Sequence, residues 1–115
     1  MAQGVHEAVT SHLPSIAVLC RQYGVERLDV FGSAARGIDF DPSRSDVDLL
    51  VRFLGETVVH HRAAVTYSHG VAQENLRKAL EQLLGRHVDL IREGSIRNPY
   101  ILRTVEEDRV TLYEA

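Results

Sequence analysis

The alternation of apolar and polar residues predicts strands in four parts of the chain. In Glu26–Phe31 ("ERLDVF") it places Leu28 and Val30 on the inner side of a strand. His87–Ile91 and Arg109–Glu114 are predicted as the third and the closing strand. The second predicted strand, Val47–Phe53, has Val47, Leu49, Val51 and Phe53 on one face and Asp46, Asp48, Leu50 and Arg52 on the other.

Apolar spacings of three and four residues predict helices between these strands. The first helix begins near Leu13, because Pro14 is tolerated only in a first turn or at a kink. It ends near Tyr23, with Gly24 just past its end. Ser33–Arg36 is predicted as a short helical turn.

The second half of the chain is predicted to hold two further helical regions. One covers Val58–Leu84, as one helix or as two pieces divided near Gly70, and Gly85 stops it. The other covers 98–108, with Asn98 as N-cap and Pro99 at the first helical position. The stripe that the longer region would bury consists of Leu76, Ala79, Leu80, Leu83 and Leu84.

Strands alternating with helices predict an α/β or α+β layered fold. The segment between the first two strands is too short for a full helix, which weakens a simple doubly wound interpretation. At 115 residues, of which 44% are hydrophobic, the chain is expected to form one domain over 1–115 with a real core.

Charge and cysteine content exclude several classes of protein. The net charge of −3 argues against a polycation that coats nucleic acid, and without Trp a base-stacking surface is not expected, so we expect no direct nucleic-acid partner. Cys20 is the single cysteine, so an internal disulfide is impossible. We expect Cys20 in the core and the protein in the cytoplasm, with no signal peptide and no membrane span.

The stretch "VFGSAARGIDFDPSRSDVDLLV" carries the first candidate chemistry. Asp46 and Asp48 are two residues apart on a predicted strand, so both leave the same face with Cα atoms roughly 7 Å apart. Such carboxylates repel each other unless a hard divalent cation lies between them. Asp89 in "HVDLI" joins them if its strand neighbours theirs. The alternative is that all three are solvent-facing acids on half-exposed strands.

Gly32 and Ser33 follow a predicted strand and open a predicted helical turn. Backbone N–H groups in that setting point at an anion, glycine permits close approach, and the Ser33 hydroxyl can donate to a phosphate oxygen. The pattern is not a Walker loop. Arg36 is expected either to reach the phosphates or to remain a surface residue, and Arg44 to be a solvated loop residue.

"FGSAARG", "SDVDLLV" and "HVDLI", in this order and spacing, resemble the minimal nucleotidyltransferases of the DNA polymerase β-like superfamily, and the resemblance extends through the tail. It implies a small mixed β-sheet flanked by helices, with Mg²⁺ as cofactor and a nucleoside triphosphate, usually ATP, as substrate. It also implies that Gly32 and Ser33 bind the triphosphate, that Asp46 and Asp48 hold metal, and that Asp89 is the third catalytic acid, as general base or metal ligand.

The acceptor is expected on another molecule, because the chain ends soon after Asp89 without the further domain of larger relatives. The small stand-alone members of the family that the chain resembles are typically antitoxins paired with an HEPN-type RNase toxin. The resemblance thus implies a protein adenylyltransferase that transfers AMP to a hydroxyl of the toxin, with tyrosine as the expected acceptor, in a type VII-like toxin–antitoxin pair. The alternatives are a non-catalytic module that neutralises its partner by binding, and a small-molecule nucleotidyltransferase.

Several features remain open at this level. His60, His61 and His69 are expected on a polar helical face rather than at a transition-metal site. His87 is predicted on the same strand face as Asp89, so it either approaches the acids or merely begins the strand. Apolar side chains in Val58–Tyr67, or around Tyr100 and Tyr113, either bind a partner or belong to the core, and a homo- or hetero-oligomer is possible.

Overall fold

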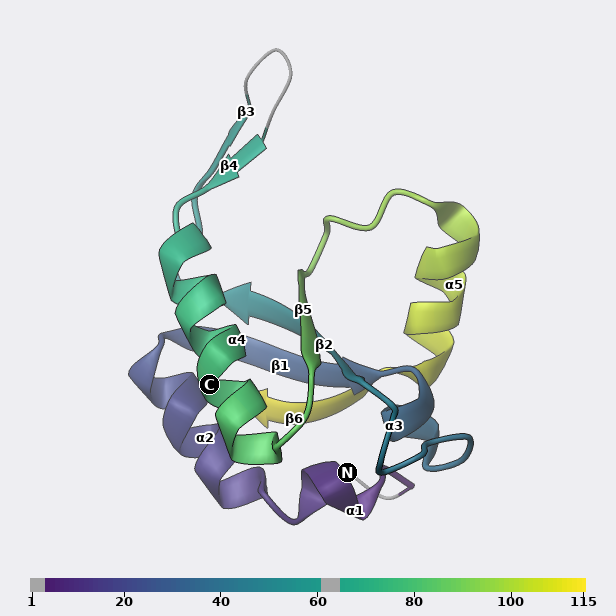
Figure 1. Cartoon of the computed structure of the whole chain (residues 1–115). Coiled ribbons are helices and arrows are strands. Elements are labelled where there is room, and N and C mark those ends of the chain that lie inside the picture. Colours follow the sequence, from purple (N-terminus) through teal and green to yellow (C-terminus); the bar gives the residue numbers. More distant parts are fainter. Residues whose placement is uncertain (1–3, 61–64) are drawn as a thin grey trace.

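The computed structural model describes residues 4–60 and 65–115, which contain a four-stranded mixed sheet. Its strands are β1 (Val25–Phe31), β2 (Val47–Phe53), β5 (Val88–Arg92) and β6 (Val110–Glu114), in the order β5-β2-β1-β6 (Figure 1). β1 is antiparallel to both β2 and β6, whereas β2 and β5 are parallel. The predicted α+β class with a mixed sheet is confirmed. An antiparallel β1–β2 pair needs no crossover helix, which explains the short connection between them.

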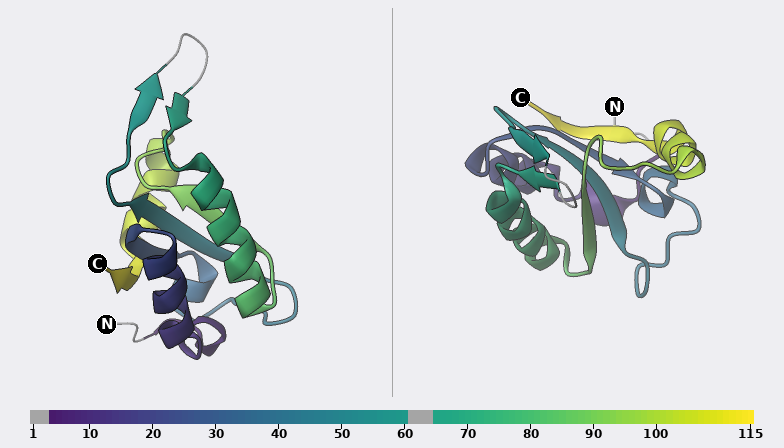
Figure 2. Two further views of the ribbon diagram at one scale, coloured as in Figure 1. Left: turned by 90° about the vertical axis from the view of Figure 1, so that its left-hand side faces the viewer. Right: turned by 90° about the horizontal axis from the view of Figure 1, so that it is seen from above.

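Helices α2 (Leu13–Gln22) and α4 (Gly70–Leu84) lie side by side against the sheet (Figure 2). They bury Ile16 and Cys20 from α2 and the Leu76, Leu80 and Leu84 stripe from α4. Across the interface, Leu28 and Val30 and the apolar face predicted for β2 are almost fully buried. Burial raises the pKa of the Cys20 thiol to about 12, so Cys20 is an unreactive core residue as expected.

The predicted helix boundaries agree with the structure at several capping positions. Gly24 and Gly85 follow α2 and α4 with φ of +70° and +67°, a left-handed conformation that glycine adopts without strain. The Asn98 side chain accepts hydrogen bonds from the backbone N–H of Tyr100 and Ile101, and thus caps α5 (Pro99–Asp108). Two short helices complete the fold, α1 (Glu7–Thr10) and α3 (Ser33–Arg36).

One predicted helical piece is wrong. The first part of Val58–Leu84 forms two antiparallel strands, β3 (Val58–His60) and β4 (Val65–Tyr67), which project from the body (Figure 1). Its β-branched residues favour a pleated strand over a helix. The expectation for the histidines is wrong too, because His60 lies in β3 and His69 just before α4, while His61 lies outside the described residues.

A buried ionic cluster joins the end of α5 to β1. Asp29, in β1, is fully buried, and its carboxylate accepts hydrogen bonds from Arg27 at 3.0 Å and Arg109 at 2.7 Å. Arg109 directly follows α5 and also donates to Glu93 at 2.8 Å. Because Asp29 and Arg109 are 80 positions apart, their contact fixes where α5 ends relative to β1.

No helix within the described residues, 4–60 and 65–115, has the length and apolar character that crossing a membrane requires.

Candidate functional site

The parallel pairing of β2 with β5 brings four polar side chains together at the start of these strands. Asp48 stands opposite Asp89 in the register, and the Val47 N–H donates to the His87 carbonyl at 3.1 Å. Asp46 therefore lies opposite His87. Since alternate residues of a strand share a face, Asp46, Asp48, His87 and Asp89 project from the same side of the sheet.

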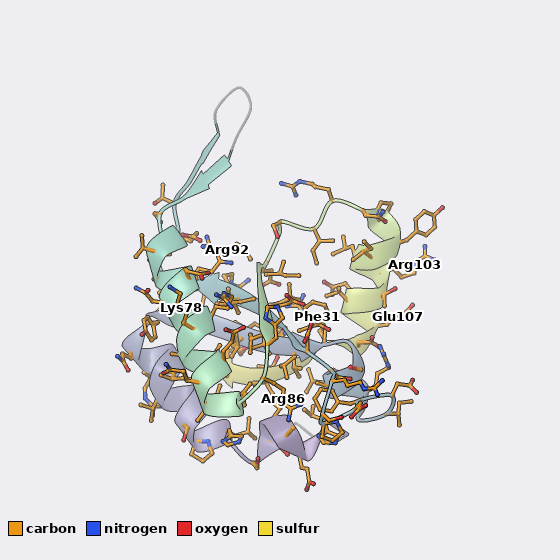
Figure 3. All side chains as sticks on the ribbon, in the orientation of Figure 1. Phe31, Lys78, Arg86, Arg92, Arg103 and Glu107 are labelled. Atoms are coloured by element: carbon orange, nitrogen blue, oxygen red, sulfur yellow. The ribbon has the colours of Figure 1, made fainter. Side chains whose placement is uncertain are left out.

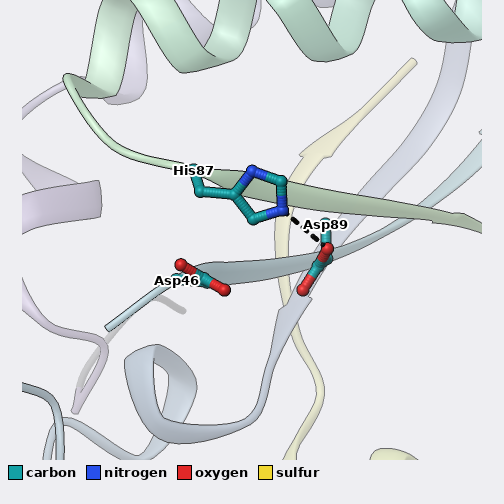
Figure 4. A group of neighbouring side chains, drawn as sticks. All are labelled: Asp46, His87 and Asp89. Carbon is teal, nitrogen blue, oxygen red and sulfur yellow. Dashed lines mark hydrogen bonds and ion pairs between the residues drawn. The ribbon is translucent and has the colours of Figure 1, made fainter. Parts of the chain in front are cut away.

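Three of these side chains have the spacing of a metal-binding group. Asp46, His87 and Asp89 each offer one ligand atom, and these atoms lie within 4.8 Å of one another (Figure 4). All three residues are exposed, so an ion in solution can reach them. Asp48 is not a member of this group but lies beside it.

The surroundings of Asp48 strongly perturb its carboxyl group. Burial, the charge of Asp89 and a hydrogen bond with that carboxyl, and the charge of Asp46 raise its pKa to about 6, against a smaller opposing effect of Arg36. The carboxylates thus repel one another at neutral pH. A hard divalent cation would relieve this repulsion, and carboxylate oxygens are its preferred ligands, so the donors fit such an ion.

Gly32 closes the site on the β1 side. It ends β1 and precedes α3 with a φ of +73°. A Cβ at position 32 would stand 2.6 Å from Oδ2 of Asp48, closer than real Cβ contacts occur. Ser33 follows as the first residue of α3. The backbone conformation therefore requires glycine here, and a side chain at this position would push the Asp48 carboxylate away.

Arg36 lies at the surface, as in one of its expected roles, and its charge also acts on the site, as in the other. Its guanidinium donates to Oδ2 of Asp108, at the end of α5, at 2.6 Å. It also lowers the pKa of Asp48, so its charge acts on the acids. Arg44, by contrast, is 87% exposed and faces only its loop neighbour Asp41 at 3.8 Å, as expected of a solvated residue.

His87 is the site residue whose role the sequence left undecided. Its Nε2 lies 3.1 Å from Oδ1 of Asp89, and its Nδ1 lies 2.9 Å from Oε2 of Glu81 in α4. The hydrogen bond with Asp89 raises the pKa of the imidazole. Of the two alternatives, His87 approaches the acids, and its shared parity with Asp89 was the signal for this.

An apolar groove of about 310 Å³ adjoins the acids through Gly32. Figure 3 shows Phe31 on the inner side of α5 and Arg103 on its outer side. Tyr100 is 79% exposed at the groove, whereas Tyr113 is half-buried and packs against the core. The groove was not expected from the sequence, since β1 and α5 are far apart in the chain. Its lining residues are Phe31, Gly32, Tyr100, Ile101, Thr104, Val105 and Asp108.

Comparison with known proteins links the chain to a family. Residues 16–112 match the model of the nucleotidyltransferase domain family. Two Methanocaldococcus jannaschii proteins named as candidate protein adenylyltransferases, MJ0128 and MJ1379, are 36% and 34% identical to the chain over 93 residues. In both, the match covers 81% of this chain and 82% of the relative.

Solved structures share the fold. A candidate minimal nucleotidyltransferase is 28% identical, with a TM-score of 0.64 over 96% of this chain and 98% of that one. A toxin–antitoxin structure with AMP-PNP is 20% identical, with a TM-score of 0.61 over 90% of this chain and 73% of that one. A chain of the complex between an MNT antitoxin and a tri-AMPylated Shewanella oneidensis HEPN toxin is 18% identical. Its TM-score is 0.58 over 92% of this chain and 72% of that one. At these identities the last two comparisons establish the fold alone.

Proposed function

The chain belongs to the nucleotidyltransferase domain family, and from this premise we propose that it transfers AMP from ATP to a hydroxyl of a partner protein. The observation that carries the proposal is the convergence of Asp46, Asp48 and Asp89 beside Gly32. Carboxylates that repel one another beside a glycine suit a metal-bound triphosphate, and their mutual repulsion costs the fold stability.

Asp46, Asp48 and Asp89 would hold Mg²⁺ in this proposal. When bound, the cation would neutralise the triphosphate and lower the pKa of the attacking hydroxyl. The donor chemistry supports this assignment, since Mg²⁺ is usually held by one or two carboxylates together with substrate phosphates.

The residues of the chain would then bind the substrate and move one proton. Gly32 and Ser33 cradle the phosphates through backbone N–H groups and the Ser33 hydroxyl, while Arg36 adds positive charge. The acceptor oxygen bonds to the α-phosphorus, and the bond from that phosphorus to the oxygen leading to the β-phosphate breaks. Pyrophosphate leaves, and the hydroxyl proton passes to the Asp89 carboxylate and then to water.

The groove between β1 and α5 suits the nucleoside end of the substrate. Gly32 lines this groove and lies beside Asp48, so a nucleotide with its phosphates over Gly32 would extend into the groove. Phe31 and Tyr100 supply aromatic surface for a base. A volume of about 310 Å³ lies at the lower end of the range for small-ligand pockets, as a nucleoside requires.

We propose a tyrosine of an HEPN-type toxin as the acceptor, which makes the chain the antitoxin of a type VII-like pair acting in the cytoplasm. Two observations support this choice. Relatives at 36% and 34% identity are named as candidate protein adenylyltransferases. A fold neighbour was solved in complex with a tri-AMPylated HEPN toxin.

The test combines the purified chain, Mg²⁺, ATP radiolabelled at the α-phosphate and an HEPN-type protein as the partner. We expect label on the partner with wild type and none with the double variant Asp46→Asn/Asp48→Asn. Asp41→Asn is the matched control, because Asp41 lies in the loop before β2 and its carboxylate contacts Ser43 and Arg44 instead of the acidic group.

Two results would replace the proposal. If the double variant neutralises the partner as well as wild type and no AMP is transferred, the protein acts by binding alone. If AMP appears on an aminoglycoside in the absence of the partner, the protein is a small-molecule nucleotidyltransferase.

A further inference from the structure

The imidazole of His87 is held from two sides by groups of different elements. Glu81, in α4, contacts Nδ1 at 2.9 Å, and Asp89, in β5, contacts Nε2 at 3.1 Å. Glu81 is itself fixed, because it accepts from the Val88 N–H at 3.0 Å and pairs with Arg77 at 2.8 Å. The ring is therefore oriented by a built arrangement of neighbours.

Each nitrogen of the ring has a carboxylate as its partner. Both nitrogens are therefore placed to donate a hydrogen bond, Nδ1 to Glu81 and Nε2 to Asp89. A cation that binds at the acids would displace the Nε2 proton, while Glu81 remains the partner of the proton on Nδ1. A carboxylate behind the distal nitrogen in this way is the usual support of a histidine that ligates a metal.

Nε2 belongs to a group of atoms with metal-ligand spacing. The nearest ligand atoms of Asp46, His87 and Asp89 lie within 4.8 Å of one another (Figure 4). Ligand atoms that share one ion at about 2.1 Å stand about 3 to 4 Å apart, so small side-chain rotations suffice to close this group around an ion.

We propose that His87, supported by Glu81, is a nitrogen ligand of the metal centre and determines its metal specificity. The inference rests on the proposed function, which requires a divalent cation beside Asp46 and Asp89. Mg²⁺ prefers all-oxygen surroundings, whereas imidazole suits first-row transition metals. His87 therefore strengthens the binding of Mn²⁺, Co²⁺ or Zn²⁺ beyond what the aspartates alone achieve, while Mg²⁺ still binds through the carboxylates.

The test measures the ratio of the Mn²⁺ and Mg²⁺ dissociation constants for the full chain, by calorimetric titration after treatment with chelator. His87→Asn replaces the nitrogen by a hard amide oxygen. We expect it to weaken Mn²⁺ binding at least tenfold while Mg²⁺ binding changes less than threefold. Glu81→Gln, which removes the charge behind Nδ1, is expected to weaken Mn²⁺ binding by about tenfold.

His69→Asn is the matched control, since His69 stacks on Phe53 at the opposite end of β2 from Asp46. It should leave both constants unchanged. A second measurement uses wild type only and does not depend on a variant that folds: the ¹⁵N resonance of His87 Nε2 should shift when Zn²⁺ is added. The inference is overturned if the resonance does not move at saturating Zn²⁺, or if His87→Asn leaves the ratio of the Mn²⁺ and Mg²⁺ dissociation constants unchanged.

Asp46→Asn separates the failure of this inference from that of the proposed function. If Asp46→Asn abolishes binding of both metals and His87→Asn alters neither, the metal centre stands and only the role of His87 is refuted. If wild type binds neither Mn²⁺ nor Mg²⁺, both the inference and the proposed function fail.

Discussion

Oδ2 of Asp48 lies 2.6 Å from the point that a Cβ on Gly32 would occupy, so the glycine and the acid are spatially complementary. The end of β1 and the start of β2, which α3 and a loop separate in the chain, meet at this contact. This close approach is a second reason for a glycine at position 32, beside the positive φ that the turn requires.

Gly32→Ala should therefore lose activity as well as stability. We expect AMP transfer to fall by 100-fold or more, because the new methyl group displaces Asp48, and unfolding to become easier by about 1–2 kcal/mol. Gly24→Ala is the matched control, since Gly24 has a similar φ of +70° but no atom within 4 Å of an added Cβ. The control should lose comparable stability in urea denaturation and keep its activity. Equal activity in the two variants would contradict the importance of the Gly32–Asp48 contact.

Asp48→Asn should abolish AMP transfer and stabilise the metal-free protein at neutral pH. The pKa of Asp48 is about 6 in the fold against 3.8 in the unfolded chain, so its contribution to stability is fully present below pH 3.8 and lost as the pH rises through 6. We expect a gain of about 1 kcal/mol at pH 7 over wild type, because water screens a half-exposed carboxylate.

Urea denaturation of the two proteins between pH 3.5 and 7.5 checks this prediction. The difference in unfolding free energy should vanish near the acid end of the range. Asp41→Asn is the control and should lower the free energy of unfolding at pH 7 instead of raising it, because hydrogen bonds from Ser43 lower the pKa of Asp41. A variant at position 48 that is less stable than wild type at pH 7 would show that the acids do not repel one another.

Thr104→Trp should fill the groove between β1 and α5. If the nucleoside binds there, the KM for ATP rises about tenfold while Mg²⁺ binding is unchanged, since the indole takes space from the base alone. Arg103→Trp is the control, because Arg103 lies on the outer side of α5 (Figure 3). An unchanged KM for ATP with a raised KM for the partner would assign the groove to the acceptor instead.

Asp29→Ala should be among the most destabilising substitutions in the chain. It leaves Arg27 and Arg109 without their buried carboxylate, and breaking such a buried pair costs about 3–5 kcal/mol. Glu74→Ala, which breaks the exposed pair with Arg77, is the control and should change the unfolding midpoint little. Midpoints that shift equally in the two variants would contradict a special role for Asp29.

Local patterns were sufficient for most of the fold. The strands at 47–53 and 110–114 and the caps at Gly85 and Asn98 follow from residues adjacent in sequence, so they could be predicted. The hairpin of β3 and β4 was missed, because its two strands are short and the strongly helical pattern that follows them was extended backwards. The Asp29–Arg109 pair was not predictable either, since no local pattern relates residues 80 positions apart.

The sequence by itself determined which residues are available for the chemistry: Gly32 and Ser33 after one strand, Asp46 and Asp48 on the next, and Asp89 beside His87 on a third. Residue type and strand parity suffice for that much. Only the tertiary structure decided which of them meet. The parallel register of β2 and β5 sets Asp48 against Asp89 and Asp46 against His87, and α4 brings Glu81 behind the imidazole. Strand register and helix docking depend on hydrogen bonds and packing between distant segments, and these have no signature in any one of them.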